Sequence, residues 1–216
     1  MLFLWLCDII ILMRTITEIK VQKRDKNKVN LSLDGEFFGV LSLETAVKNG
    51  LKKGSILDEK VLERIVIESN KKIAYEKAIN YVSKHFKSQR EVERYLYEKE
   101  YNSEVVFYVI KKMREYGFID DEKFCESFIA HHKQKDGYNK IKEQLKIKGI
   151  DEKIILSCLE EQEGQLDLII ACKEKYMRNK EETKENYAKL YRYLVGKGFK
   201  IDEILKVLKG ELEWLA

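Results

Sequence analysis

The chain of 216 residues contains no proline, although average usage would place about ten in this length. Proline interrupts helices because its ring removes a hydrogen-bond donor and clashes with the preceding turn. The absence of proline therefore favours long, uninterrupted helices and excludes proline-rich linkers. Apolar residues make up 44% of the chain, which excludes a disordered protein.

Closely spaced cysteines are also missing. The four cysteines include no Cys-x-x-Cys pair, and at least 14 residue steps separate any two of them. Disulfide frameworks and zinc sites need more regular and closer spacings than these. We interpret the cysteines as reduced thiols of a cytoplasmic protein, and we expect no metal or other cofactor. They are Cys7, Cys125, Cys158 and Cys172.

The common catalytic motifs are absent too: the chain has no G-x-x-x-x-G-K-[ST], H-E-x-x-H or G-x-S-x-G. The acidic run Asp120-Asp121-Glu122 is interpreted as a helix N-cap, because carboxylates accept hydrogen bonds from first-turn N–H groups and complement the helix dipole. His131 and His132 are adjacent, so on a helix they point in different directions and do not form a metal pair. We therefore interpret the chain as a binding protein, not an enzyme.

A strong excess of positive charge is missing as well, because 41 basic residues face 37 acidic ones. A dedicated nucleic-acid protein usually carries more, so any basic surface must be local. Residues 133–148 hold six lysines against two acidic residues. They form either a solvated helix face or a contact surface for an acidic partner or phosphate. With the cations around residues 84–94, the candidate contact residues are Lys84, Lys87, Arg90, Arg94, Lys133, Lys135, Lys140, Lys142 and Lys146.

Residues 1–13 form the one strongly apolar run, but a membrane-spanning helix needs about 20 such residues. Asp8 interrupts the run, and the basic start and cleavage site of a signal peptide are missing. We favour an extension from an upstream start codon, with Met13 as the natural start. A packed N-terminal helix and a membrane attachment remain as alternatives, although we expect no membrane partner.

Residues 14–69 predict a small unit of strands and helices. Apolar and polar residues alternate over Val29–Leu33, which is typical of a strand, and Asp34-Gly35 is a strong hairpin signal. We expect strands only within about residues 15–41. A short helix should end near Asn49-Gly50, and Asp58 should cap a second helix that ends near Ser69. The unit is either a binding surface or a folded cap.

From residue 70 onward the sequence repeats with a period of 49 residues. Leu96, Leu145 and Leu194 occupy one position of the repeat, and three positions later Lys99, Lys148 and Lys197 occupy another. The apolar spacing predicts three helices in each repeat, and repeats of this size stack into a curved array. The predicted fold is mainly α: an elongated array of three tandem three-helix repeats after the small β-hairpin unit. The predicted segments are 1–13, 14–69, 70–118, 119–167 and 168–216.

The second helix of two repeats ends in a glycine turn, Lys148-Gly149-Ile150 and Lys197-Gly198-Phe199, where glycine supplies a left-handed cap. The first repeat has Glu100 at the equivalent position, so the end of its helix is less well marked.

Four motifs follow the patterns of one known family. Lys87-Ser88-Gln89-Arg90-Glu91-Val92 is similar to its pattern of a basic residue, Ser, two variable positions, Glu and an aliphatic residue. Gly117–Cys125 resembles its Gly-aromatic-aliphatic-Asp-Asp-x-x-Phe-Ala signature. Gly137–Ile150 and Leu190–Phe199 match its second and third repeats. The family that these motifs resemble is RecX, the regulatory proteins of the RecA recombinase. The resemblance covers about residues 70–210, with Tyr138 in place of a common Pro and Cys125 in place of Ala.

The resemblance implies a monomeric, cytoplasmic, non-enzymatic regulator that lies in the groove of the RecA–DNA filament. It implies limits on strand exchange and on the co-protease activity of the filament in DNA repair and the SOS response. Whether this chain inhibits or only tunes its recombinase stays open. The alternative is a helical-repeat module that binds DNA weakly and non-specifically. Tyr81, Tyr95, Tyr97 and Tyr138 could stack on a single strand, although their spacing places most of them in the core.

Overall fold

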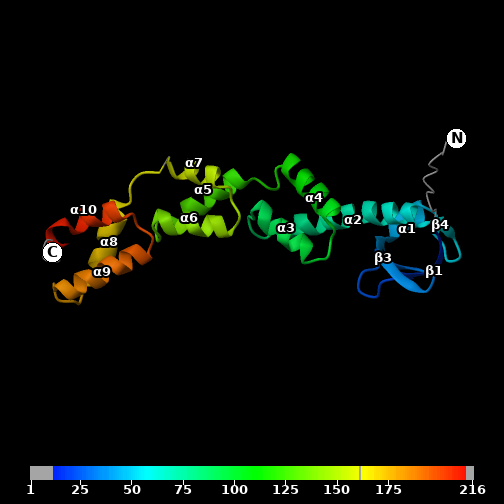
Figure 1. The fold of residues 1–216 in the computed structure, drawn as a ribbon, viewed down its shortest axis with the longest axis horizontal. Helices are drawn as coiled ribbons and strands as arrows, with labels where there is room; N and C mark the ends of the chain where they lie inside the picture. Colours follow the sequence, from blue (N-terminus) through cyan, green and yellow to red (C-terminus); the bar gives the residue numbers. More distant parts are fainter. Residues whose placement is uncertain (1–11, 161, 213–216) are drawn as a thin grey trace, which may run out of the picture. The chain divides into compact units, whose positions relative to one another are not determined.

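The computed structural model describes residues 12–160 and 162–212, so the prediction for residues 1–13 lies almost entirely outside the described residues. The chain divides into two compact units. The first unit comprises the residues up to 84 together with 94–116, and the second comprises 85–93 together with 117 onward. Figure 1 shows both units and labels their helices and strands except β2.

A four-stranded antiparallel sheet opens the first unit. The strands β1 (Met13–Val21), β2 (Lys28–Leu33), β3 (Glu36–Ser42) and β4 (Ile56–Asp58) lie in the order β3-β2-β1-β4. The hairpin predicted at Asp34-Gly35 is confirmed: both residues have positive φ, 48° and 92°, as a type I′ turn requires. The limit of residues 15–41 for strands was wrong, because β4 adds three residues that pair with the start of β1. Such a short strand shows no alternation in the sequence.

The core of the first unit lies between the sheet and two helices, α1 (Leu43–Lys48) and α2 (Glu59–Val82) (Figure 1). The alternating residues of β2 all point into it, because successive side chains of a strand face opposite sides. Ser42 caps α1 by accepting a hydrogen bond from the Thr45 N–H at 3.0 Å. The buried core residues are Ile16, Val29, Leu31, Leu33, Leu41, Ala46, Leu51 and Leu62.

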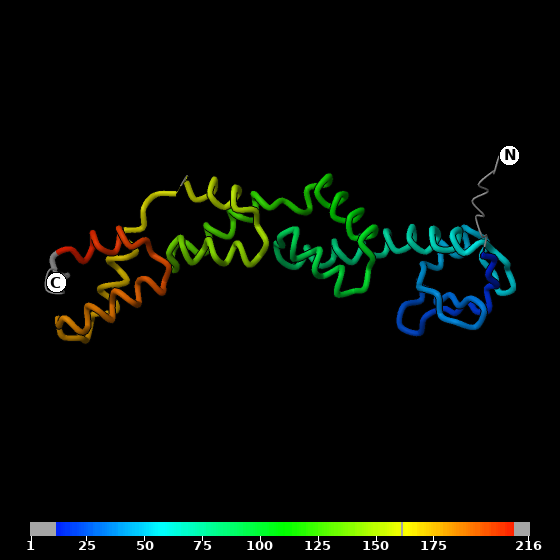
Figure 2. The backbone as a smooth tube through the Cα atoms, viewed as in Figure 1, coloured from blue at the N-terminus to red at the C-terminus, as the bar shows by residue number. Residues whose placement is uncertain are grey.

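Helix α2 is longer than predicted. The Asp58 side chain caps it as expected, accepting from the Lys60 N–H at 2.9 Å, but the helix continues past Ser69 to Val82. The expected end at Ser69 was wrong, since no proline or glycine interrupts residues 59–82. Figure 2 traces α2 as one unbroken helix, and it contacts both β3 and α4. Its second half supplies the first helix of the first repeat.

The remaining helices confirm the prediction of three-helix repeats. The buried Leu column is also confirmed, since Leu96, Leu145 and Leu194 are each 0% exposed. The helices are α3 (Gln89–Tyr97) and α4 (Ser103–Glu115), then α5 (Asp121–His132), α6 (Tyr138–Ile147) and α7 (Glu152–Glu160), and finally α8 (Leu166–Met177), α9 (Lys184–Gly196) and α10 (Ile201–Leu212).

The turn after the second helix is left-handed in every repeat. Gly149 and Gly198 have φ values of 80° and 87°, and Glu100 adopts the same region with φ 61°. A residue with a Cβ atom is strained there, because the Cβ approaches the following carbonyl oxygen. Glu100 therefore stores strain that glycine would not.

We expect Glu100→Gly to stabilise the protein by about 0.5–1 kcal/mol, because the relief of strain exceeds the added entropy of the unfolded chain. Urea denaturation measures the difference. Glu98→Gly is the matched control, since Glu98 has no positive φ and its replacement should destabilise the fold. An equal loss of stability in both variants would contradict the assignment of strain to residue 100.

Candidate partner-binding surface

Five residues, 133–137, connect α5 to α6 in the second unit. The Lys133 and Lys135 side chains are both exposed. Lys133 Nζ donates a long hydrogen bond to Gln162 Oε1 at 3.4 Å, and no acidic residue in the described part of the chain pairs with either lysine. This loop therefore presents two cations to solvent.

The other predicted lysines of this region are engaged within the protein. Lys140 Nζ lies 2.8 Å from Asp136 Oδ1, and Lys142 Nζ and Lys146 Nζ lie 3.1 and 3.2 Å from Glu152 Oε1. Burial alone would raise the pKa of Asp136, but the hydrogen bond and charge of Lys140 hold that pKa below its ordinary value. The six lysines of residues 133–148 therefore do not all contribute free positive charge. Glu152 lies just outside this segment and pairs with two of them, Lys142 and Lys146.

The four earlier candidate cations lie in or before α3. Lys84 and Arg94 belong to the first unit, and Arg94 forms a long ion pair of 3.9 Å with Glu98. Lys87 and Arg90 belong to the second unit. The Arg90 stem packs over Gly149, where an added Cβ would lie 2.0 Å from Arg90 Cδ. Arg90 therefore has a packing role beside any contact with a partner.

One docking contact is repeated along the second unit. The Ser88 hydroxyl, at the start of α3, donates to the Lys148 carbonyl at 2.7 Å. Forty-nine residues later, the Gly137 N–H donates to the Lys197 carbonyl at 2.9 Å. The turn that ends the second helix of one repeat thus docks on the N-terminus of the second helix of the preceding repeat. Its carbonyl oxygens satisfy polar hydrogens that a helix start or its cap leaves unpaired.

The start of α3 is a capping box within this contact. The Ser88 N–H donates to Glu91 Oε2 at 3.1 Å, and the Glu91 N–H donates to Ser88 Oγ at 3.2 Å. Lys148 Nζ lies 3.0 Å from the second carboxylate oxygen. Burial would raise the pKa of Glu91, but the Ser88 N–H and Lys148 lower it. The Ser-x-x-Glu motif of the sequence therefore caps a helix and anchors the next repeat.

Asp120 and Asp121 have different roles. Asp120 caps α5 as predicted, accepting from the Lys123 N–H at 3.0 Å, and this hydrogen bond lowers its pKa. Asp121 Oδ1 accepts from the Gln89 N–H at 2.9 Å and so caps the neighbouring helix α3. No local sequence pattern indicates this second role, because the two partners are 32 residues apart.

Gln165 is the other residue whose role no local sequence pattern indicates. Its Oε1 accepts from the Tyr138 N–H at 2.9 Å, and its Nε2 donates to the Lys133 and Asp136 carbonyls at 3.3 and 3.0 Å. The buried Tyr138 also donates its hydroxyl to the Glu163 carbonyl at 3.1 Å. Gln165 therefore fixes the shape of the cationic α5–α6 loop. No motif marks a single buried glutamine.

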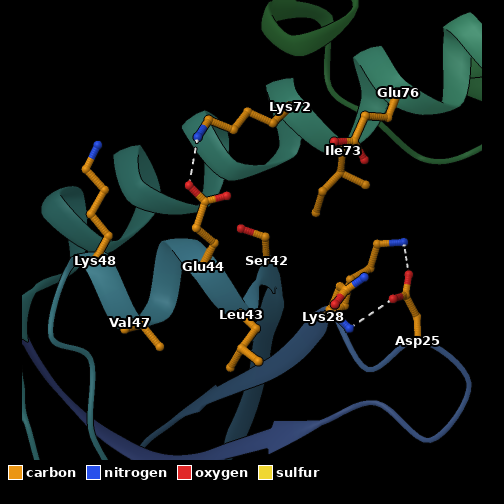
Figure 3. Close-up of a pocket in the computed structure, with 11 residues that line it drawn as sticks. Asp25, Lys28, Ser42, Leu43, Glu44, Val47, Lys48, Lys72, Ile73 and Glu76 are labelled. Carbon is orange, nitrogen blue, oxygen red and sulfur yellow. Dashed lines mark hydrogen bonds and ion pairs between the residues drawn. The ribbon is translucent and has the colours of Figure 1, made fainter.

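A cleft lies in each unit. One of about 700 Å³ is lined by Lys133, Tyr138, Gln165 and Asp167 among others. The other, of about 790 Å³, has the apolar side chains of Leu43, Val47 and Ile73 along it. In Figure 3, Lys72 reaches across to Glu44, 3.7 Å away. Neither cleft gathers the paired nucleophile and base that catalysis would require.

Within residues 12–160 and 162–212, no group of three His, Cys, Asp or Glu side chains is arranged to hold a metal ion. Over the same residues, no helix combines the length and apolar character needed to cross a membrane. Cys125 is buried, and Cys158 and Cys172 are half-buried thiols.

Four models of the RecX family match successive parts of the chain. The Regulatory protein RecX N-terminal domain matches residues 14–58, and the first, second and third three-helix domains match 74–113, 120–159 and 163–208. The Regulatory protein RecX of Clostridium tetani is 36% identical over 199 residues, covering 89% of this chain and 92% of the relative. That of Clostridium acetobutylicum is 34% identical, covering 90% and 95%.

Two solved structures share the fold. A crystal structure of regulatory protein RecX matches with a TM-score of 0.65 and 26% identity, covering 91% of this chain and 99% of that chain. The structure of RecX from Lactobacillus salivarius matches with a TM-score of 0.62 and 24% identity, covering 66% and 96%. The second likeness concerns the fold alone.

Proposed function

Since the chain belongs to the RecX family of regulatory proteins, we propose that it is a negative modulator of a RecA-type recombinase. It binds the recombinase–DNA filament and limits strand exchange and co-protease activity. The observation that carries this proposal is the match of all four family segments in order along one chain. The absence of a catalytic arrangement in either cleft is consistent with action by binding.

The mechanism is occupancy of a filament surface. A protein that binds one filament state more tightly than another shifts the population toward that state, in proportion to the difference in affinity. The docked repeats of the second unit hold the α5–α6 loop in one shape through Gln165 and Lys197, whose Nζ donates to the Lys135 carbonyl at 2.8 Å. A preorganised cationic loop loses little entropy on binding an acidic partner.

Charge reversal in the α5–α6 loop tests the proposed binding to recombinase filament. We expect Lys133→Glu with Lys135→Glu to weaken binding to recombinase filament about tenfold or more, because two contacts of roughly 1 kcal/mol each are replaced by repulsion. Filament binding is measured by anisotropy of the labelled protein, alongside a strand-exchange assay that the parent protein should slow.

The matched control is Lys52→Glu with Lys53→Glu, which changes the charge equally at two exposed lysines of the first unit. It should bind filament as the parent does. Equal weakening in both variants would assign the effect to net charge. A parent protein that leaves strand exchange unchanged or accelerates it would contradict negative modulation.

We do not expect the same test to work at Lys140 or Lys142. Reversal of either would place a carboxylate beside Asp136 or Glu152, so folding would change together with binding. The assignment of Lys84, Lys87, Arg90, Arg94 and Lys146 to the contact surface stays a prediction.

A further inference from the structure

Three lysines from separate elements gather in the first unit. Lys28 begins β2, Lys77 lies on α2, and Lys99 follows the end of α3. Lys77 Nζ lies 5.1 Å from the centre of the Tyr101 ring, and Lys99 Nζ lies 5.7 Å from the centre of the Tyr95 ring. We call Lys28, Lys77, Lys99, Tyr95 and Tyr101 the lysine–tyrosine patch.

The positive charges of the patch repel one another. The pKa of Lys77 is lowered first by burial and then by the ammonium groups of Lys28 and Lys99. Asp25 is an acidic group that faces them, and it is already bound to Lys28 (Figure 3). It also accepts a hydrogen bond from the Asn27 N–H, and both interactions lower its pKa. The three ammonium groups of the patch therefore outnumber the carboxylate of Asp25. An anion bound among the three lysines would remove this repulsion.

Further exposed cations lie close along the chain to residues of the patch. Lys23, Arg24 and Lys26 are exposed in the turn between β1 and β2. Lys84 follows the end of α2, seven residues after Lys77, and it is exposed as well. An extended series of cations fits a linear polyanion better than a single carboxylate.

Aromatic side chains accompany the cations. Tyr81 and Tyr95 stack with ring centres 4.2 Å apart, and they support the patch instead of offering two free faces. Tyr97, also on α3, is 52% exposed. Tyrosine rings can stack a base while lysines of the same surface hold its phosphates.

We propose that the lysine–tyrosine patch is a binding site for the phosphodiester backbone of single-stranded DNA. The inference does not depend on the recombinase as partner, because it concerns the first unit and the test uses DNA alone. It gives the N-terminal unit a binding role that the cationic loop of the second unit does not share. A regulator with this site would contact the nucleic acid as well as protein.

The test is binding of a fluorescein-labelled oligothymidylate to the full chain, measured by anisotropy over a range of salt concentrations. We expect Lys28→Gln, Lys77→Gln and Lys99→Gln together to weaken binding more than tenfold. The slope of log K against log salt should fall by about 2, since each lost phosphate contact contributes about 0.7 for single strands. The control replaces Lys52, Lys53 and Lys60, three exposed lysines of the same unit, with glutamine. It should retain parental affinity and slope.

A second measurement avoids the question of folding in the triple variant. Acetylation of the parent protein is followed by mass spectrometry with and without the oligonucleotide, and Lys77 and Lys99 should be protected while Lys52 and Lys53 are not. Unprotected Lys77, or equal losses in the triple variant and its control, would overturn the proposal. Equal competition by polyglutamate would also overturn it, in favour of an acidic protein surface.

Discussion

Gly137→Ala is expected to undock the third repeat from the second. It should lower the free energy of unfolding by about 3 kcal/mol or more, which is the upper end of what overpacking costs. A Cβ at residue 137 would lie 2.1 Å from the Gly198 carbonyl carbon and 2.2 Å from the Phe199 nitrogen. Both are backbone atoms, so no change of rotamer relieves the clash. The docking bonds of 2.9 and 3.0 Å from the Gly137 and Asn139 N–H groups would then be lost.

The backbone conformation of Gly137 separates the cost of the clash from any cost of backbone strain. Its φ and ψ of −73° and 154° are accessible to any residue, so alanine adds contact without conformational strain. Gly196→Ala is the control, because an added Cβ there meets no atom within 4 Å at the end of α9. Urea melts should separate the two variants, and limited proteolysis of Gly137→Ala should cut between α7 and α8. Parental stability in Gly137→Ala would show that the repeats do not dock through this glycine.

Leu145→Ala is expected to cost about 2–5 kcal/mol, because truncation of a buried leucine leaves a cavity that the surroundings fill only in part. Leu145 is 0% exposed and belongs to the core cluster of the second repeat, with Phe124, Ile141 and Ile150. The free energy of unfolding from urea denaturation gives the cost.

Ile147→Ala on the same helix is the matched control for Leu145→Ala. Its side chain is 80% exposed, so its loss should change stability by less than about 0.5 kcal/mol. A cost below that limit for Leu145→Ala would mean that the Leu column of the repeats does not form the core.

The sequence by itself determined the elements that depend on neighbouring residues. The Asp34-Gly35 hairpin, the Asp58 and Asp120 caps and the buried Leu column followed from turn preferences, capping and helical periodicity, which act over a few residues. The three-helix repeats followed from their period. The resemblance to the RecX family rested on the same local motifs, and the four family segments confirm it.

The end of α2 and the presence of β4 were not predicted from neighbouring residues. The sequence has no proline or glycine near Ser69 that would end a helix. The predicted boundary between the β-hairpin unit and the first repeat was nevertheless placed after residue 69, and α2 runs through it. β4 exists because β1 offers it an edge to pair with, and three residues carry no periodic signal of their own.

Tertiary structure alone decided which charges are available to a partner. Lys142 and Lys146 look like free cations until α7 brings Glu152 beside them, whereas Lys133 and Lys135 stay exposed. The gathering of Lys28, Lys77 and Lys99, and the bonds of Gln165, join residues that the chain separates by about 20 to 70 positions. Coulomb forces and hydrogen bonds depend on distance in space, and for such residues only the folded backbone sets that distance.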